Sequence, residues 1–347
     1  MRPGMDGRGI GISRAAIFLW LGMLLVASLI LSVMVGSVSI RPQETIRALF
    51  EGGAGPNDVV ATIVRKIRLP RTLLAGIVGA CLSLAGLGFQ AISRNPLADP
   101  SVLGVSSGAS FGLMVAMLLG MAGPTSNPAV TTLFAFAGAL LAAVLVYAIA
   151  RVDGRLPMTT LLLSGVIIGL FFTSCVMLAT VLLGAAELQG VVFWLMGNLS
   201  PASTSSLWVL TAVLGIGVVA LAREAPRLNI LALGEEQALQ LGVEAERVKR
   251  VVFVAASLIT GAAISAAGSI GFVGLIVPNA SRLLLGPDNR SLVPMSILLG
   301  ATFLILADLG ARTVAGSLEL PVGVVTSFCG APLFVYLLRR HRGAESW

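Results

Sequence analysis

Apolar residues in this chain gather into long runs, which are separated by short segments rich in charge, proline or glycine. A helix needs about 20 mostly apolar residues to cross a bilayer. The pattern predicts about ten such helices joined by short connections, with no separate soluble domain. Their expected ranges are 15–40, 72–92, 102–121, 129–150, 157–184, 204–222, 251–269, 270–285, 293–310 and 322–338.

Composition agrees with this pattern. Hydrophobic residues make up 56% of the 347 positions and charged residues 11%, whereas a soluble chain is typically ~25% charged. A bilayer can accommodate so much apolar surface, and a water-soluble core cannot. We therefore predict an all-α membrane protein with a transmembrane domain at 15–338 and short tails at 1–14 and 339–347.

Basic residues are shared unevenly between alternate connections. If the N-terminus is cytoplasmic, most of the 23 Lys and Arg residues fall on the cytoplasmic side, so the positive-inside rule predicts that both tails are cytoplasmic. The basic residues follow no single face, so we expect no nucleic-acid binding. An external basic group at 65–71 goes against the rule and needs a separate explanation.

An internal repeat is visible at an offset of 182 residues. It aligns GACLSLAG at 79–86 with GAAISAAG at 261–268, and Pro96 with Pro278. Helices rich in small residues can share such patterns by chance. A true repeat of about five helices would be inverted, because five predicted spans separate the copies, and inverted repeats are common in transporters.

Catalytic and metal-binding functions find little support. GVSSG at 104–108 fits the pattern around a serine nucleophile, but the only histidine, His341, lies in the C-terminal tail and cannot activate Ser106. The predicted spans also lack the clusters of His, Cys or carboxylate that a bare metal ion needs. We expect no catalytic residue, no metal site and no cofactor bound by this chain, so a metal would cross inside an organic chelate.

An energy source is not evident within the chain. Neither of its two lysines, Lys66 and Lys249, belongs to a P-loop, so ATP would have to act through a partner. The segment 223–250 is the only long cytoplasmic loop that we predict, and EQALQLG at 236–242 has the spacing of loops through which ABC importers contact their ATPases. A solvated surface helix would show the same spacing. The alternative function is a secondary transporter driven by an ion gradient.

Several blocks of sequence are distinctive when taken together: RLPR (68–71), QAISRNPLADPSVLGVSSGAS (90–110), WLMGNLS (194–200), LGEEQALQLGVEAERVKR (233–250), GSIGFVGLIVPNASRLLLGPDNR (268–290), LADLGAR (306–312) and ELPVGVVTSFCGAPLFVYLL (319–338). They resemble the FecCD-type permeases, the membrane subunits of ABC importers for iron-siderophores, haem and vitamin B12. The resemblance covers about residues 60–340.

The resemblance implies a multi-pass protein of the bacterial inner membrane that works within a larger complex. Its partners would be a second permease subunit, identical or different, two ATPase subunits that bind ATP and Mg, and a periplasmic or lipid-anchored substrate-binding protein. A ferric siderophore is the first expectation for the cargo, ahead of haem and cobalamin.

The resemblance also implies three sites. The ATPase would contact Gly234, Glu235, Glu236, Ala238, Leu241 and Gly242. The binding protein would place its acidic residues on Arg68, Arg71 and Arg312, on the external rim, which would explain the external basic group. The cytoplasmic gate would consist of Asn95, Leu97, Met158 and Thr159.

Two further features follow from the same comparison of residues. The fifth and tenth helices would line the path, although Gly165 and Gly169 on the fifth could equally serve helix packing. The family usually has His after the Pro of the G-L-I-V-P block, where this chain has Asn279, so no role of that histidine is transferred to Asn279.

Overall fold

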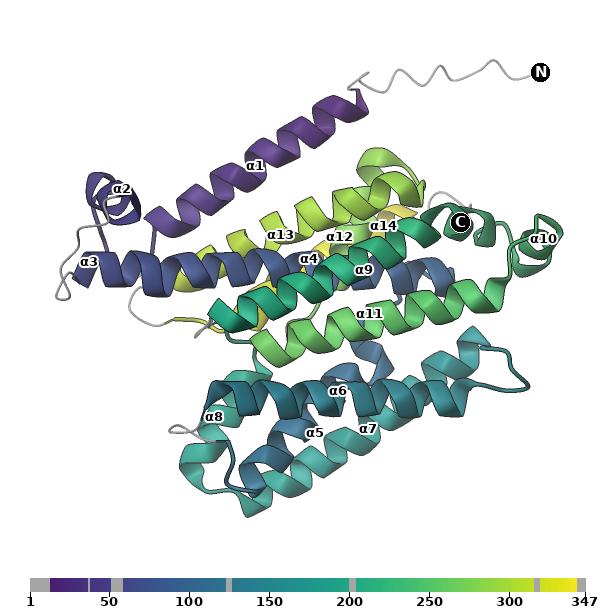
Figure 1. Cartoon of the computed structure of the whole chain (residues 1–347), viewed down its shortest axis with the longest axis horizontal. Coiled ribbons are helices and arrows are strands. Elements are labelled where there is room, and N and C mark those ends of the chain that lie inside the picture. The colour runs from purple at the N-terminus through teal and green to yellow at the C-terminus, as the bar shows by residue number, and fades with distance from the viewer. Residues whose placement is uncertain are drawn as a thin grey trace.

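The fold is a bundle of helices, which the computed structural model describes over residues 13–36, 38–50, 59–122, 127–199, 204–314 and 319–341. Within these ranges the only β-structure is one isolated bridge between Val152 and Arg155. Among the described residues, seven helices are long and apolar enough to cross a membrane, and three shorter apolar helices accompany them. Figure 1 shows most of the long helices running lengthwise beside one another.

Each of the ten ranges predicted from the sequence overlaps one apolar helix. These helices are α1 (Arg14–Met34), α4 (Leu69–Ser93), α5 (Val105–Leu118), α6 (Pro128–Ala150), α7 (Met158–Leu182), α9 (Thr204–Leu231), α11 (Ala245–Ala267), α12 (Val273–Leu285), α13 (Asn289–Thr313) and α14 (Val322–His341). The shorter elements are α2 (Pro42–Phe50), α3 (Val59–Thr62), the π-helix η1 (Ile63–Arg68), the 3-10 helix η2 (Pro100–Leu103), α8 (Ala185–Leu195) and α10 (Glu235–Gln240). The predicted all-α fold is confirmed for the described residues, while most of the two predicted tails lies outside them.

The long cytoplasmic loop predicted at 223–250 is wrong in extent. Helix α9 continues through Pro226 to Leu231, and α11 already begins at Ala245. Hydropathy marks only the apolar part of a helix, so the polar turns that extend α9 and α11 carry no such signal. Only a short connection that contains α10 joins the two helices.

The external basic group lies in a helix and not in a connection before a span. Residues Val59–Ser93 form one helical stretch of 35 residues made of α3, η1 and α4. The residues at both junctions, Thr62 and Arg68, have right-handed helical dihedral angles, so the helix continues through them. Helix α1 is shorter than its predicted range of 15–40. It ends at Met34, and Val35 adopts extended backbone.

Helix α4 is the centre of the bundle. Within its apolar window 83% of residues are buried, against 22% for α1. It packs against α9, α11, α12 and α13, and glycines bring the helices close together. A Cβ on Gly79 would lie 2.2 Å from the carbonyl oxygen of Gly300 on α13, and a Cβ on Gly86 would lie 2.0 Å from that of Gly274 on α12.

Helix lengths and directions agree with an inverted repeat. A long helix, a short one and a long one follow each other as α4, α5 and α6, and again as α11, α12 and α13. Arg94, just after α4, lies 3.9 Å from Glu235, and Lys249, in the first turns of α11, lies 2.9 Å from the same carboxylate. The end of α4 therefore meets the start of α11, so the two copies begin at opposite ends of the bundle.

The bundle has two chemically different ends. The arginine end holds the starts of α4 and η1 and the ends of α1 and α13, with Arg68, Arg71 and Arg312. The coupling end holds α10 with the end of α4 and the start of α11. Figure 1 shows α2 and α3 at the left, by the arginine end, and α10 at the right. The predicted docking and coupling residues thus lie at opposite ends.

Candidate functional site

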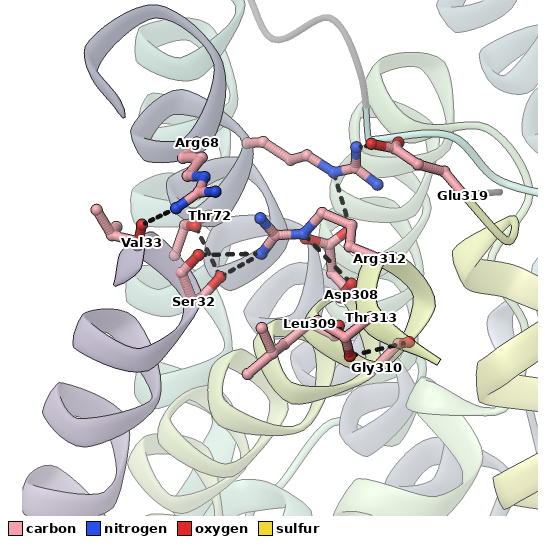
Figure 2. Close-up of polar contacts among 11 residues, drawn as sticks. Ser32, Val33, Arg68, Thr72, Asp308, Leu309, Gly310, Arg312, Thr313 and Glu319 are labelled. Carbon is pink, nitrogen blue, oxygen red and sulfur yellow. Dashed lines mark hydrogen bonds and ion pairs between the residues drawn. The ribbon is translucent and has the colours of Figure 1, made fainter. Parts of the chain in front are cut away.

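Two of the three arginines at the arginine end, Arg71 and Arg312, pair with two carboxylates. Arg71 Nε lies 2.9 Å from Asp308 Oδ1, and its Nη1 lies 2.6 Å from Glu319 Oε2. Arg312, one helical turn after Asp308, places its Nε 2.9 Å from Asp308 Oδ2. Figure 2 shows Asp308 beside Arg312, with Glu319 on the segment before α14.

The same arginines hold the end of α1, whose last carbonyl groups have no partners within the helix. Arg68 Nη1 donates to the carbonyl oxygens of Val33, at 3.1 Å, and Met34, at 2.9 Å. Arg312 Nη2 donates to Ser32 Oγ at 2.6 Å, and Ser32 in turn shares a hydrogen bond with Thr72 on α4. These contacts explain why α1 ends here.

The exposure predicted for these arginines is wrong. Arg68, Arg71 and Arg312 keep only 3%, 6% and 3% of their surface exposed. Asp308 and Glu319 neutralise charge on Arg71 and Arg312, and carbonyl oxygens of α1 accept hydrogen bonds from Arg68, which makes burial tolerable. Arg71 borders a pocket of about 260 Å³ that Glu319, Asn198 and Pro321 also line, so solvent reaches the cluster from that side. Docking of a binding protein at these arginines stays a prediction.

The predicted ATPase-contacting residues form a short helical turn at the coupling end. Gly234 and Gly242 flank α10 with φ angles of 129° and 76°, values that favour glycine. Ala238 is fully buried and packs into the core below, and its N–H donates to the carbonyl oxygen of Gly234. The outward side presents Glu235, Glu236 and the apolar side chains of Leu239 and Leu241.

The four predicted gate residues lie on two adjacent segments at the coupling end. Asn95 Oδ1 accepts a hydrogen bond from the N–H of Leu97 at 2.9 Å, which tightens the turn between α4 and η2. Met158 begins α7 and lines a small cavity together with Ala98 of that turn. Leu97 and Thr159 are exposed.

A pocket of about 410 Å³ opens on the protomer surface between α5 and α7. Its wall combines hydroxyl groups and glycines, among them Ser106, Ser107, Thr173 and Gly169, with several apolar side chains. Ser106 Oγ shares a 2.9 Å hydrogen bond with Ser269 Oγ rather than with an imidazole. Gly165 also borders the pocket, but a Cβ there would lie 2.8 Å from the Cα of Leu103, so this glycine serves close packing as well.

Comparison with known proteins decides the family. The model of the FecCD transport family matches residues 24–340. The chain belongs to the FecCD transport family. This confirms the resemblance found in the sequence, and with the apolar helices it makes the chain a multi-pass membrane protein.

Two relatives and one solved structure illustrate the similarity. The chain is 44% identical over 289 residues to the cobalamin import system permease protein of Halobacterium salinarum, covering 82% of this chain and 75% of the relative. It is 39% identical over 284 residues to a protein of Helicobacter pylori named a probable iron chelatin transport system permease, covering 82% and 84%. A solved structure, described as an inward-facing conformation of a metal-chelate type ABC transporter, has a TM-score of 0.81 at 31% identity, covering 94% and 99%.

One polar network of this FecCD chain was not predicted from the sequence. Asn279 on α12 donates through Nδ2 to the carbonyl oxygen of Pro96, at 3.0 Å, and so holds the gate turn. Its Oδ1 accepts from Arg282, which also donates to Gln90 of α4. The sequence marks Asn279 only as a departure from the family. Its hydrogen bond to Pro96 could not be predicted, because the two residues are 183 positions apart in the chain.

Proposed function

We propose that this chain is the permease subunit of an ABC importer that carries a metal chelate into the cytoplasm. The observation that carries the proposal is the FecCD family match over residues 24–340. The 0.81 TM-score with a metal-chelate type ABC transporter supports it over nearly the whole length of both chains. A secondary transporter would need its own ion-coupling groups inside the membrane, whereas the buried carboxylate Asp308 is paired with Arg71 and Arg312 at the arginine end.

The coupling end would face the cytoplasm and receive the ATPase. The outward residues of α10 combine two carboxylates with exposed leucines, a surface suited to a cleft in another protein. Buried Ala238 seats the helix on the bundle, so a push on α10 would be passed to the helices below. The binding protein would dock at the opposite, arginine end.

A second permease subunit would complete the path beside α7. Along this helix large apolar side chains are more than half exposed, including Leu163, Ile167, Leu170, Met177 and Leu178. Lipid could cover these side chains, but the hydroxyl-lined pocket opens on the same face and would be poorly solvated by lipid. In a subunit interface, the partner would cover the apolar side chains of α7, and an aqueous path would run along Thr173 and Ser106.

The cargo would be a cobalt or iron chelate. The relative at 44% identity is named for cobalamin and the one at 39% for an iron chelate, so we place cobalamin first and a ferric siderophore second. This reverses the order expected from the sequence, which ranked ferric siderophores ahead of haem and cobalamin. The bulk of any of these chelates fits a path formed between two subunits better than one within a single bundle.

Reconstitution tests the proposal. The tagged chain, purified from its own cells, should retain an ATPase subunit, and proteoliposomes that contain the complex and its binding protein should take up cyanocobalamin or ferrichrome only with ATP. Uptake should be insensitive to ionophores. A chain that purifies without an ATPase, and whose uptake collapses when the ion gradient is dissipated, would overturn the proposal in favour of a secondary transporter.

A further inference from the structure

Lys249 is a buried cation at the coupling end, outside the predicted ATPase contacts and the predicted gate. It is one of two lysines in the chain, and its side chain is only 2% exposed. Nζ lies 2.8 Å from Glu246 Oε1 on the same helix and 2.9 Å from Glu235 Oε1 on α10. A buried ammonium group is stable only while it stays paired, so Lys249 binds α10 firmly to the start of α11.

The same lysine also holds the segment that leads into α7. Lys249 Nζ lies 3.4 Å from the carbonyl oxygen of Leu156, and the N–H of Leu156 donates to Glu246 Oε2 at 2.7 Å. Both backbone polar groups of Leu156 are thus bonded to side chains of α11. Since Leu156 is separated from Met158 only by Pro157, which has a restricted φ, this anchor sets where the gate residue Met158 stands.

Glu235 reaches the other gate segment as well. Its Oε1 lies 3.9 Å from Nη2 of Arg94, the residue directly before Asn95. Arg94 has a φ of 51° and ends α4, and the N–H of the next residue, Asn95, donates to the carbonyl oxygen of Gln90. The pair between Arg94 and Glu235 is largely exposed and weaker than the pair with Lys249. The Glu235 carboxylate therefore contacts both Arg94, which precedes the gate residue Asn95, and Lys249, which holds the segment before Met158.

We propose that Glu235 and Lys249 are positioning residues that transmit movement of α10 to the two gate segments of the importer. The inference rests on the proposed function, because it takes α10 as the ATPase contact and residues 95–97 and 158–159 as the gate. When the ATPase displaces α10, Glu235 moves with it. The buried ammonium of Lys249 follows that carboxylate and carries Leu156 along, while Arg94 follows on the other side. Both segments then move together with α10.

Two substitutions break this linkage at different points. Lys249→Met removes the cation while keeping a long apolar side chain, and Glu235→Gln removes the carboxylate from a site that is 43% exposed, where loss of charge is easily tolerated. Lys249→Arg keeps the charge and serves as the conservative variant. Arg151→Met is the matched control: Arg151 is exposed, lies in the connection that also holds Leu156, and has no ion-pair partner in the part of the chain that the structure describes.

The first readout is the ratio of cargo imported to ATP hydrolysed by the complete complex, with whichever of cyanocobalamin and ferrichrome the parent imports. We expect Lys249→Met and Glu235→Gln to lower this ratio about tenfold while ATP hydrolysis continues, a loss within the usual range of coupling between sites. Lys249→Arg and Arg151→Met should keep the parent ratio. If the complex of Lys249→Met does not assemble, Glu235→Gln decides when compared with Glu236→Gln, which removes a neighbouring predicted ATPase-contact carboxylate that forms no ion pair with Lys249 in the described part of the chain.

The second readout is the distance between nitroxide labels on Leu97 and Leu239, both exposed, in a chain whose Cys81, Cys175 and Cys329 are replaced by serine. In the parent the distribution of this distance should stay narrow through the ATP cycle, and in the two variants the distribution should broaden. A parent complex without ATP-dependent uptake would refute the proposed function itself. A parent that transports normally, with unchanged ratio and distance in both variants, would refute only the linkage through Glu235 and Lys249.

Discussion

Arg71 and Asp308 are 237 residues apart in the chain, yet Arg71 Nε donates to Asp308 Oδ1 at 2.9 Å. Asp308 is completely buried, and its other oxygen faces Arg312. One carboxylate thus holds two arginines from helices α4 and α13. The arginine end is therefore a structural junction of the bundle first, and any docking of a partner must take place on top of it.

Removing that carboxylate should be costly. Asp308→Asn would leave the buried Arg312 without its carboxylate and Arg71 with Glu319 alone, and the loss of one partner of a buried pair typically costs about 3–5 kcal/mol. Thermal unfolding of the detergent-solubilised protein should show a large drop in midpoint. Glu319→Gln is the matched comparison, because its side chain is 46% exposed and a pair of this kind is worth about 0.2–1 kcal/mol. Equal stability of the two variants would contradict this account of the junction.

Docking of a binding protein can be tested at the exposed side of the same junction. Replacing all three arginines with Glu would disrupt the fold, so Glu319→Gln is the better probe. It frees Arg71 Nη1 at the edge of the 260 Å³ pocket, where a partner's carboxylate could take its place. We expect the variant to bind the binding protein more tightly, with a steeper dependence on salt, in a titration at two ionic strengths. Unchanged affinity and salt response would argue that the cluster is structural only.

Close packing of α4 against α12 predicts a strong difference between two glycines. Gly86→Ala would place a Cβ 2.0 Å from the carbonyl oxygen of Gly274 and force the helices apart, at a cost of about 1–3 kcal/mol typical of overpacking. Gly22→Ala on α1 meets no atom within 4 Å and should stabilise the helix by about 0.5–1 kcal/mol. Thermal unfolding of both variants, measured side by side, checks the prediction. A neutral effect of Gly86→Ala would show that the helices can separate freely.

The turn after α10 should discriminate between substitutions by size and charge. Gly242 has a φ of 76° and no atom within 4 Å of an added Cβ, so the site has room but requires left-handed backbone. Asn tolerates that conformation, so Gly242→Asn should preserve association with the ATPase. Gly242→Arg should insert normally into the membrane, yet lose transport and bind the ATPase weakly, because a long charged side chain would stand in the contact. Co-purification of the ATPase with each variant measures the difference, and normal uptake by Gly242→Arg would show that the turn contacts no partner.

Much of the local structure could be predicted from residues near one another in the chain. The apolar runs located the ten apolar helices of the described residues. Helix ends were predicted less well. Both α9 and α11 extend through polar turns, since a helix continues by backbone hydrogen bonding after its hydrophobic contact with the membrane has ended.

What the sequence determined by itself is the membrane-spanning class of the protein, because hydropathy is a property of each segment alone. Only the tertiary structure decided which charges neutralise each other. Arg71 meets Asp308, and Asn279 meets Pro96, through the packing of segments that are distant in the chain. Coulombic attraction and hydrogen bonding depend on distance in space, and that distance is set by glycine contacts such as Gly86 with Gly274, which no single segment reveals.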